Sequence, residues 1–269
     1  MRPNRATTAI FLLGILSAAA RPSQPAEHAF ERYVANLEAR LAWQHATGGI
    51  HIAATNAEGE LIAGAVRVEQ VNGGSWQVDG GLLHHWRAVA FVPHASAKDM
   101  LALLNDYNNF SRYYSPEVVS ARVLAVDGTT TTLAMRMKKK QVVTVVLDAE
   151  FQVQSGLAGG SRGYSFSRST HIWQIDHAGT ERERRRAEGA DDGFLWRLNS
   201  YWTFEQIGDG LFIECEAVSL TRAVPAGLGW LVIPIIRNLP RDSLQFTLTA
   251  TRNALAAVAI RRNINAHAK

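Results

Sequence analysis

Two pairs of residues have the types and spacing of a metal site or a proton-transfer site. His84 and His85 are typical metal ligands, but neighbours on a strand point to opposite faces, so they are not expected to share one ion. Glu214 and Glu216 are two residues apart and would share a face, as a general acid and a general base must. The opposite face of this segment would carry small and apolar residues such as Ile213, which predicts that both glutamates face solvent. We therefore predict neither a metal site nor catalysis at these positions.

Two further motifs suggest chemistry at first sight. Residues 159–163, GGSRG, match the G-x-S-x-G nucleophile elbow, which needs a helix directly after the serine. The residues that follow Ser161 alternate like a strand, so a hairpin turn is predicted instead. The run ERERRRAE at 181–188 alternates in charge and predicts a solvated strand or hairpin, with a site for an anionic lipid headgroup as the alternative. Phosphate-binding and dinucleotide-binding fingerprints are absent from the sequence, and no cofactor is predicted.

Composition is that of a globular protein with a full core. The chain has 269 residues, 47% of them hydrophobic and 19% charged. Its 28 basic and 24 acidic residues leave a small positive charge, which does not indicate a nucleic-acid partner. Cys215 is the only cysteine, so no internal disulfide can form.

The first 20 residues resemble a secretory signal peptide. Arg2 and Arg5 precede an apolar stretch at 9–16, which ends in small residues near Ala20. We expect cleavage there and a periplasmic or secreted protein. The alternative is an N-terminal anchor helix that stays in place, although the apolar run is short for a membrane span.

The rest of the chain predicts a helix, a long antiparallel sheet and a second helix. Apolar residues at helical spacing predict a helix over 26–46, and Ser96 with Asp99 predicts a capped helix start. From 118 to 220, alternating runs between glycine-containing turns predict six or seven antiparallel strands. The clearest strand spans 194–205, where five residues are expected to share a core-facing side, the other side facing water: Phe194, Trp196, Leu198, Trp202 and Phe204.

The last predicted helix starts near Pro240. Its apolar stripe, spaced by four and three residues, includes Leu244, Leu248 and Leu255. Only the concave face of the sheet is long enough to receive this stripe. Trp202, Phe204, Ile213 and Cys215, together with Ala88 and Ala90, are therefore expected to face it.

These segments carry a family resemblance. The runs LLHHWRAVAFVPHAS, LLNDYNNFSRYYSPEVVSARVL and YWTFEQIGDGLFIECEAVSLTRAVP, in this order of elements, resemble the START-related SRPBCC superfamily, the Bet v 1-like or helix-grip fold. The resemblance covers residues 80–257. It implies an α+β fold in which a curved antiparallel sheet wraps around the long C-terminal helix, here with an additional N-terminal helix. It also implies an apolar cavity between sheet and helix, of the kind used by lipid carriers, coenzyme Q-binding proteins and polyketide aromatase/cyclases.

The predicted organisation has four parts. Residues 1–20 are the signal peptide, 21–79 an N-terminal helix and strand extension, 80–260 the START-like domain, and 261–269 a basic tail. Between the last strand and the long helix, the apolar segment 225–239 contains Pro234. We expect a proline-broken turn there, which prevents fusion into one helix and serves either as a lid over the cavity or as a plug of the core.

The leading functional hypothesis is an exported protein that holds a lipid, isoprenoid, quinone or polyketide-like molecule without covalent chemistry. The alternatives are an aromatase/cyclase-type enzyme and a structural protein with a filled cavity. Transient membrane contact is left open, nucleic acid is not expected, and the sequence does not indicate an oligomeric state. The residues expected to form wall and lid are Met135, Met137, Trp202, Phe204, Ile213, Cys215, Trp230 and Ile233. The polar candidates, for the case of turnover, are Tyr164, Arg168 and His171.

Overall fold

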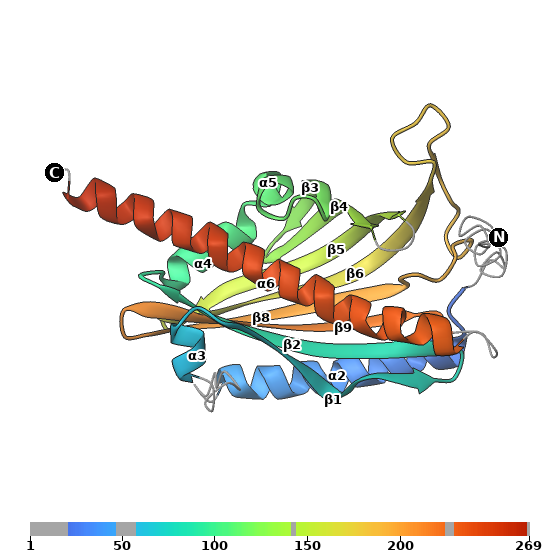
Figure 1. The fold of residues 1–269 in the computed structure, drawn as a ribbon, viewed down its shortest axis with the longest axis horizontal. Coiled ribbons are helices and arrows are strands. Elements are labelled where there is room, and N and C mark those ends of the chain that lie inside the picture. The colour runs from blue at the N-terminus through green and yellow to red at the C-terminus, as the bar shows by residue number, and fades with distance from the viewer. Residues whose placement is uncertain (1–20, 47–57, 141–143, 224–228, 268–269) are drawn as a thin grey trace, which may run out of the picture.

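The computed structural model describes residues 21–46, 58–140, 144–223 and 229–267, and in the last range it describes side chains for 238–261. In these residues one antiparallel sheet dominates the fold (Figure 1). Its strands lie in the order β1-β2-β9-β8-β6-β5-β4-β3, and the short β7 pairs with β6. The strands are β1 (Val66–Val78), β2 (Gly81–Pro93), β3 (Val118–Asp127), β4 (Thr130–Lys140), β5 (Thr144–Ala158), β6 (Arg162–Asp176), β7 (Arg184–Arg185), β8 (Arg197–Ile207) and β9 (Gly210–Thr221).

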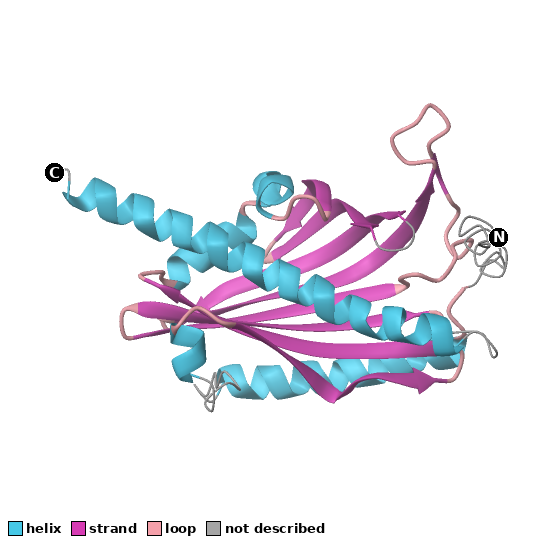
Figure 2. Cartoon of the chain, viewed as in Figure 1, coloured by secondary structure: helices cyan, strands magenta, loops and turns pink. Residues whose placement is uncertain are grey.

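Helices cover both faces of this sheet (Figure 2). The long α6 (Gly229–His267) packs along β2, β1 and β9 on one face, which we call the inner face. On the opposite, outer face lies α2 (Gln24–Ala46), whose Phe30 and Leu41 pack with Leu83 and Tyr201. The remaining helices are α3 (Glu58–Ile62), α4 (Ala97–Asn105), the 3₁₀ turn η2 (Tyr107–Asn109) and α5 (Phe110–Tyr113).

The helix-grip fold class predicted from the sequence is confirmed. The strands are antiparallel, and the buried Leu244, Leu248 and Leu255 of α6 share one cluster with Ala88, Ala90, Trp202, Phe204, Ile213 and Cys215. Local predictions also hold. The helix predicted for 26–46 is α2, and Ser96 and Asp99 form the capping box of α4.

The predicted hairpin turn around Ser161 is confirmed as well. Gly159 and Gly160 both have positive φ angles, 74° and 82°, which residues with a side chain rarely adopt. They connect β5 to β6, and the segment after Ser161 is a strand. A nucleophile elbow requires a helix in that place, so the GGSRG match carries no catalytic meaning here.

The prediction of a proline-broken segment before the last helix was wrong. The helix begins at Gly229 and runs through Pro234 and Pro240 without interruption. Each proline removes one backbone donor from the helix, and Pro234 lies close to the first turn, where the amide groups have no partner within the helix. Residues 224–228 lie outside the described part of the chain.

The strand prediction for 194–205 also needs correction. The strand predicted for 194–205 begins at Arg197, and Trp196 packs in the outer cluster with α2 instead of sharing a face with Trp202. The side of β8 expected to face water is covered by α2, so Asn199 and Thr203 are buried. In the charged run, Arg184 and Arg185 form the exposed strand β7, which pairs antiparallel with β6 as in a hairpin, so the prediction of a solvated strand or hairpin is confirmed; the rest of the run is turn and loop.

Candidate ligand-binding face

The inner face of the sheet carries two apolar clusters, and they differ in which helices pack over them. The first contains Trp202, Phe204, Ile213 and Cys215, whose exposed fractions lie between 0 and 6%. The helix α6 lies directly on this cluster through Leu248 and its neighbours. These four predicted wall residues therefore belong to a packed core between sheet and helix.

The second cluster lies on the other half of the inner face, over β4, β5 and β6. Its buried members include Leu133, Phe151 and Ile172. Around them lies a set of partly exposed apolar side chains, which we call the apolar patch: Ala121, Met135, Met137, Leu147 and Leu198. The predicted wall residues Met135 and Met137 thus lie together, but apart from the other four.

The apolar patch lies beyond the strands on which α6 packs. That helix follows β1, β2 and β9, whereas β3 to β6 extend away from it (Figure 1). One end of this half is covered by η2 and α5, where Tyr107 and Phe110 contact the cluster. At the free edge of the sheet, β3 exposes Val123 and Val126, with 41% and 68% of their surface accessible. The apolar surface therefore continues from the cluster to the sheet edge.

Two neutral hydroxyl groups separate the two clusters. Ser167 of β6 and Ser200 of β8 are cross-strand partners on the inner face, and both are half-buried. Within the described residues neither hydroxyl has a hydrogen-bond partner in the protein. They could therefore donate to or accept from a bound molecule.

Charged side chains are concentrated on the outer face. Along β4, Met135 and Met137 face inward and Arg136 faces outward, where its guanidinium contacts Asp148 at 2.6 Å and Glu183 at 2.8 Å. Between Leu133 and Met137 on β4 and between Leu147 and Val153 on β5, the inner positions are all uncharged. The inner face of these strands suits an uncharged molecule, because a buried charge without a partner is costly.

The three polar candidates lie on the outer face and do not join the apolar residues. Arg168 contacts Glu38 of α2 at 2.5 Å, and the ring of Tyr164 stacks on His45 of the same helix at 5.0 Å. His171 stacks on Trp173 at 5.2 Å between ring centres. Trp230 and Ile233 belong to the first turns of α6, but their side chains lie outside the described residues.

The glutamates expected to face solvent are instead buried under α2. Glu214 is 5% and Glu216 1% exposed. Nη2 of Arg40 lies 2.7 and 2.8 Å from the two oxygens of Glu216, and Nε2 of His85 lies 2.8 Å from one of them. Burial alone would raise the pKa of Glu216, but the hydrogen bonds from His85 and Arg40 outweigh it and lower the pKa to about 2.

The two adjacent histidines point to opposite faces, as predicted. His85 lies in the outer network, while His84 makes hydrogen bonds with Ser75 at 2.7 Å and Thr221 at 2.9 Å. The described residues contain no group of three or more potential metal ligands.

The charged run at 181–188 is engaged in ion pairs within the protein. Arg186 contacts Asp176 and Asp192, at 2.8 and 2.9 Å, and Arg185 contacts Asp148 at 2.9 Å. These arginines are therefore already neutralised by carboxylates, which disfavours the lipid-headgroup alternative.

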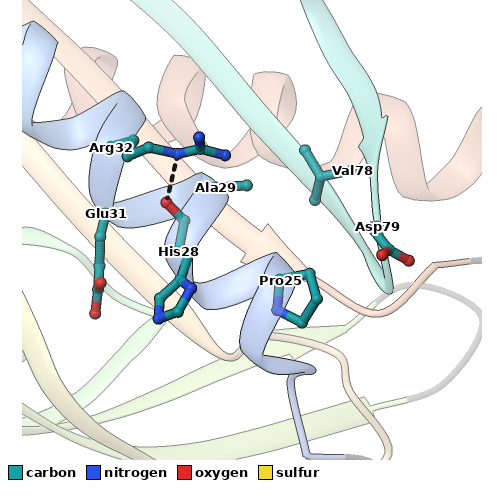
Figure 3. Close-up of a pocket in the computed structure, with 7 residues that line it drawn as sticks. All are labelled: Pro25, His28, Ala29, Glu31, Arg32, Val78 and Asp79. Carbon is teal, nitrogen blue, oxygen red and sulfur yellow. Dashed lines mark hydrogen bonds between the residues drawn. The ribbon is translucent and has the colours of Figure 1, made fainter.

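A shallow hollow on the outer side lies between α2 and the end of β1 (Figure 3). Its lining is mixed in polarity and includes Glu31, Arg32 and Asp79 beside Ala29 and Val78. None of the predicted site residues lines it. Among the described helices, none is long and apolar enough to cross a membrane.

No protein-family model and no curated protein matches the chain. Among solved structures, it is similar to a STAR-related lipid transfer protein from Xanthomonas axonopodis (17% identity, 71% of this chain, 98% of that chain, TM-score 0.46). It is also similar to a START superfamily protein from Mycobacterium smegmatis (14% identity, 65% of this chain, 99% of that chain, TM-score 0.44). A third similar structure is the Zhui aromatase/cyclase from Streptomyces (14% identity, 67% of this chain, 95% of that chain, TM-score 0.39). These proteins belong to the groups that the sequence resemblance named. The likeness is distant, and the fold assignment rests on the strand order and helix placement described above.

Proposed function

We propose that the protein binds an uncharged apolar small molecule on the inner face of the sheet, over β3 to β6. The apolar patch carries this proposal, because its methionines and leucines remain partly exposed in a protein whose other inner residues are packed under α6. Methionine side chains adapt to ligands of varied shape. The hydroxyls of Ser167 and Ser200 could bind a neutral oxygen of such a molecule.

The chemistry of this face favours binding over turnover. General acid-base catalysis needs a titratable group within hydrogen-bond reach of the reacting atom. On β4 from Leu133 to Met137 and on β5 from Leu147 to Val153 the inner positions are apolar, while Arg168 and His171 lie behind the sheet. The next inner residue of β4, Lys139, forms an ion pair with Glu117. A lipid, isoprenoid, quinone or polyketide-like molecule would fit this face, and polyketide cyclisation is the second candidate.

Uptake of Nile red, an uncharged fluorescent dye, tests this proposal. Met135→Lys places a charge in the apolar patch and should weaken dye binding by more than about tenfold, or about 1.4 kcal/mol. The matched control is Thr132→Lys, which adds the same charge on the same strand but on the outer face. It should bind the dye as the wild type does. Equal loss in both variants, or no uptake by the wild type, would contradict the proposal.

We further propose that the protein acts outside the cytoplasm after removal of residues 1–20. These residues lie outside the described part of the structure, and the proposal rests on the signal-like pattern of Arg2, Arg5 and the apolar stretch that follows. The intact mass of the protein from the cells that make it tests this. A chain that begins near Arg21 supports export, whereas a membrane-bound chain that begins at Met1 supports the retained anchor.

A further inference from the structure

A hydrogen-bonded chain of Tyr33, His85 and Glu216 lies on the outer face, away from the proposed ligand face. The hydroxyl of Tyr33 is 2.6 Å from Nδ1 of His85, and Nε2 of His85 is 2.8 Å from Glu216. The three residues come from α2, β2 and β9. This order of hydroxyl, imidazole and carboxylate is the arrangement that activates a nucleophile in hydrolytic triads.

The direction of each hydrogen bond follows from the charge of Glu216. Arg40 holds this carboxylate from the other side, and an ionised carboxylate can only accept hydrogen bonds. Nε2 of His85 therefore donates to Glu216, and in the neutral form of the imidazole Nδ1 is then the acceptor. Tyr33 then donates its hydroxyl proton to Nδ1, as a nucleophile assisted by a general base would.

The oxygen of Tyr33 lies at the outer end of the Tyr33–His85–Glu216 chain, next to an irregular segment of β1. The side-chain amide of Asn72 donates to this oxygen at 2.9 Å, and Asn72 is exposed. Asn72, Gly73 and Gly74 have φ angles of 51°, 81° and 76°, and residues 71–74 have no paired partner on β2. Asparagine adopts a positive φ more readily than most residues, and the irregular segment 71–74 holds its side chain beside Tyr33.

We propose that Tyr33 is a base-assisted nucleophile that accepts an acyl group from a carboxylic ester. The Tyr33 oxygen would form a bond to the carbonyl carbon while its proton passes to Nδ1 of His85. The bond from that carbon to the alcohol oxygen of the ester then breaks. The alcohol oxygen keeps the electron pair and takes the proton from Nδ1 of His85, so the products are acylated Tyr33 and a neutral alcohol. The amide of Asn72 is placed to stabilise the negative charge that develops at the Tyr33 oxygen as its proton leaves.

The groups around Tyr33 favour transfer of its proton to His85 during the reaction over a tyrosine that is already ionised. Burial is the main reason that the pKa of Tyr33 is raised, so the phenol keeps its proton until a base removes it during the reaction. The charged groups around His85 are Arg40 from α2, Arg87 from β2, and Glu216 and Glu214 from β9. Glu69 of β1 lies opposite Arg87 in the strand register.

Acetylation by p-nitrophenyl acetate tests the proposal, with the modified tyrosines located by peptide mass spectrometry. Tyr113 is the internal control, since its hydroxyl donates to Asp106 at 2.6 Å and contacts no imidazole. Tyr33 should be acetylated about 100-fold faster than Tyr113.

Two variants separate this role from a purely structural one. His85→Gln keeps a polar group beside Glu216 and should reduce the Tyr33 rate to that of Tyr113. Asn72→Gly removes the amide donor and tolerates the positive φ of residue 72, so it should leave the fold intact and slow acetylation by about tenfold or more. Equal labelling of Tyr33 and Tyr113 in the wild type, or an unchanged Tyr33 rate in both variants, overturns the proposal.

Discussion

At the scale of single residues, Glu216 links stability to pH. Its pKa in the folded protein is about 2, below the ordinary value of 4.5. A carboxyl group whose pKa is lowered by folding stabilises the protein above its unfolded pKa, and this contribution is lost as the pH falls. The loss attributable to Glu216 should therefore occur between about pH 4.5 and about pH 2.

Glu216→Gln should lower the free energy of unfolding at neutral pH by about 3 kcal/mol, because Arg40 and His85 lose their charged partner. Urea unfolding at neutral and acidic pH measures this. The variant should also lose stability less steeply in acid than the wild type. Glu205→Gln, a change on the outer side of β8, is the control and should behave as the wild type. Equal effects of the two substitutions would show that the buried network does not stabilise the fold.

The sequence predicted which residues share a face better than it predicted what covers them. Alternation correctly placed Glu214 and Glu216 together, and Met135 with Met137. It could not show that Arg40, 176 positions earlier, covers Glu216. A strand face that meets solvent and a strand face that packs against the polar side of a helix can carry the same charged residues. The residue types around Glu214 and Glu216 therefore do not show whether these side chains are buried.

At the scale of elements, α6 holds the inner face through one stripe of leucines. Leu248 is completely buried, so Leu248→Ala should cost about 2 to 5 kcal/mol of unfolding free energy. Ile260 on the same helix is 60% exposed, and Ile260→Ala should change stability by less than about 0.5 kcal/mol. Thermal or denaturant unfolding of both variants measures the difference. Similar values for the two would mean that α6 does not rest on the sheet as described.

Helical spacing predicts this stripe, but Pro234 and Pro240 suggest an interruption, so the start of the helix at Gly229 does not follow from the sequence pattern. A proline weakens a helix at one hydrogen bond and does not by itself decide whether the helix continues. Likewise, the alternating pattern before Arg197 suggested a longer strand, although Trp196 turns to the outer cluster. Where a helix or strand begins depends on tertiary packing, and the local pattern of residues does not contain that information.

At the scale of the whole molecule, the sheet separates two environments. The inner face is apolar and uncharged between Leu133 and Met137 on β4 and between Leu147 and Val153 on β5, whereas the outer face carries ion pairs, several of them with residues of α2. The sequence predicted the fold class from the order of its elements. It did not predict which half of the inner face is covered, because core and ligand-binding surfaces have the same composition.

The most direct test of the binding account is native mass spectrometry of the purified protein, followed by organic extraction. The account predicts a complex heavier than the chain by one small molecule, which is lost on denaturation and recovered in the extract as an uncharged apolar compound. Met135→Lys should carry less of it than Thr132→Lys, because only the first substitution places a charge on the inner face. A wild-type protein with the mass of the bare chain, which also takes up no Nile red, would contradict the account and indicate a filled core instead.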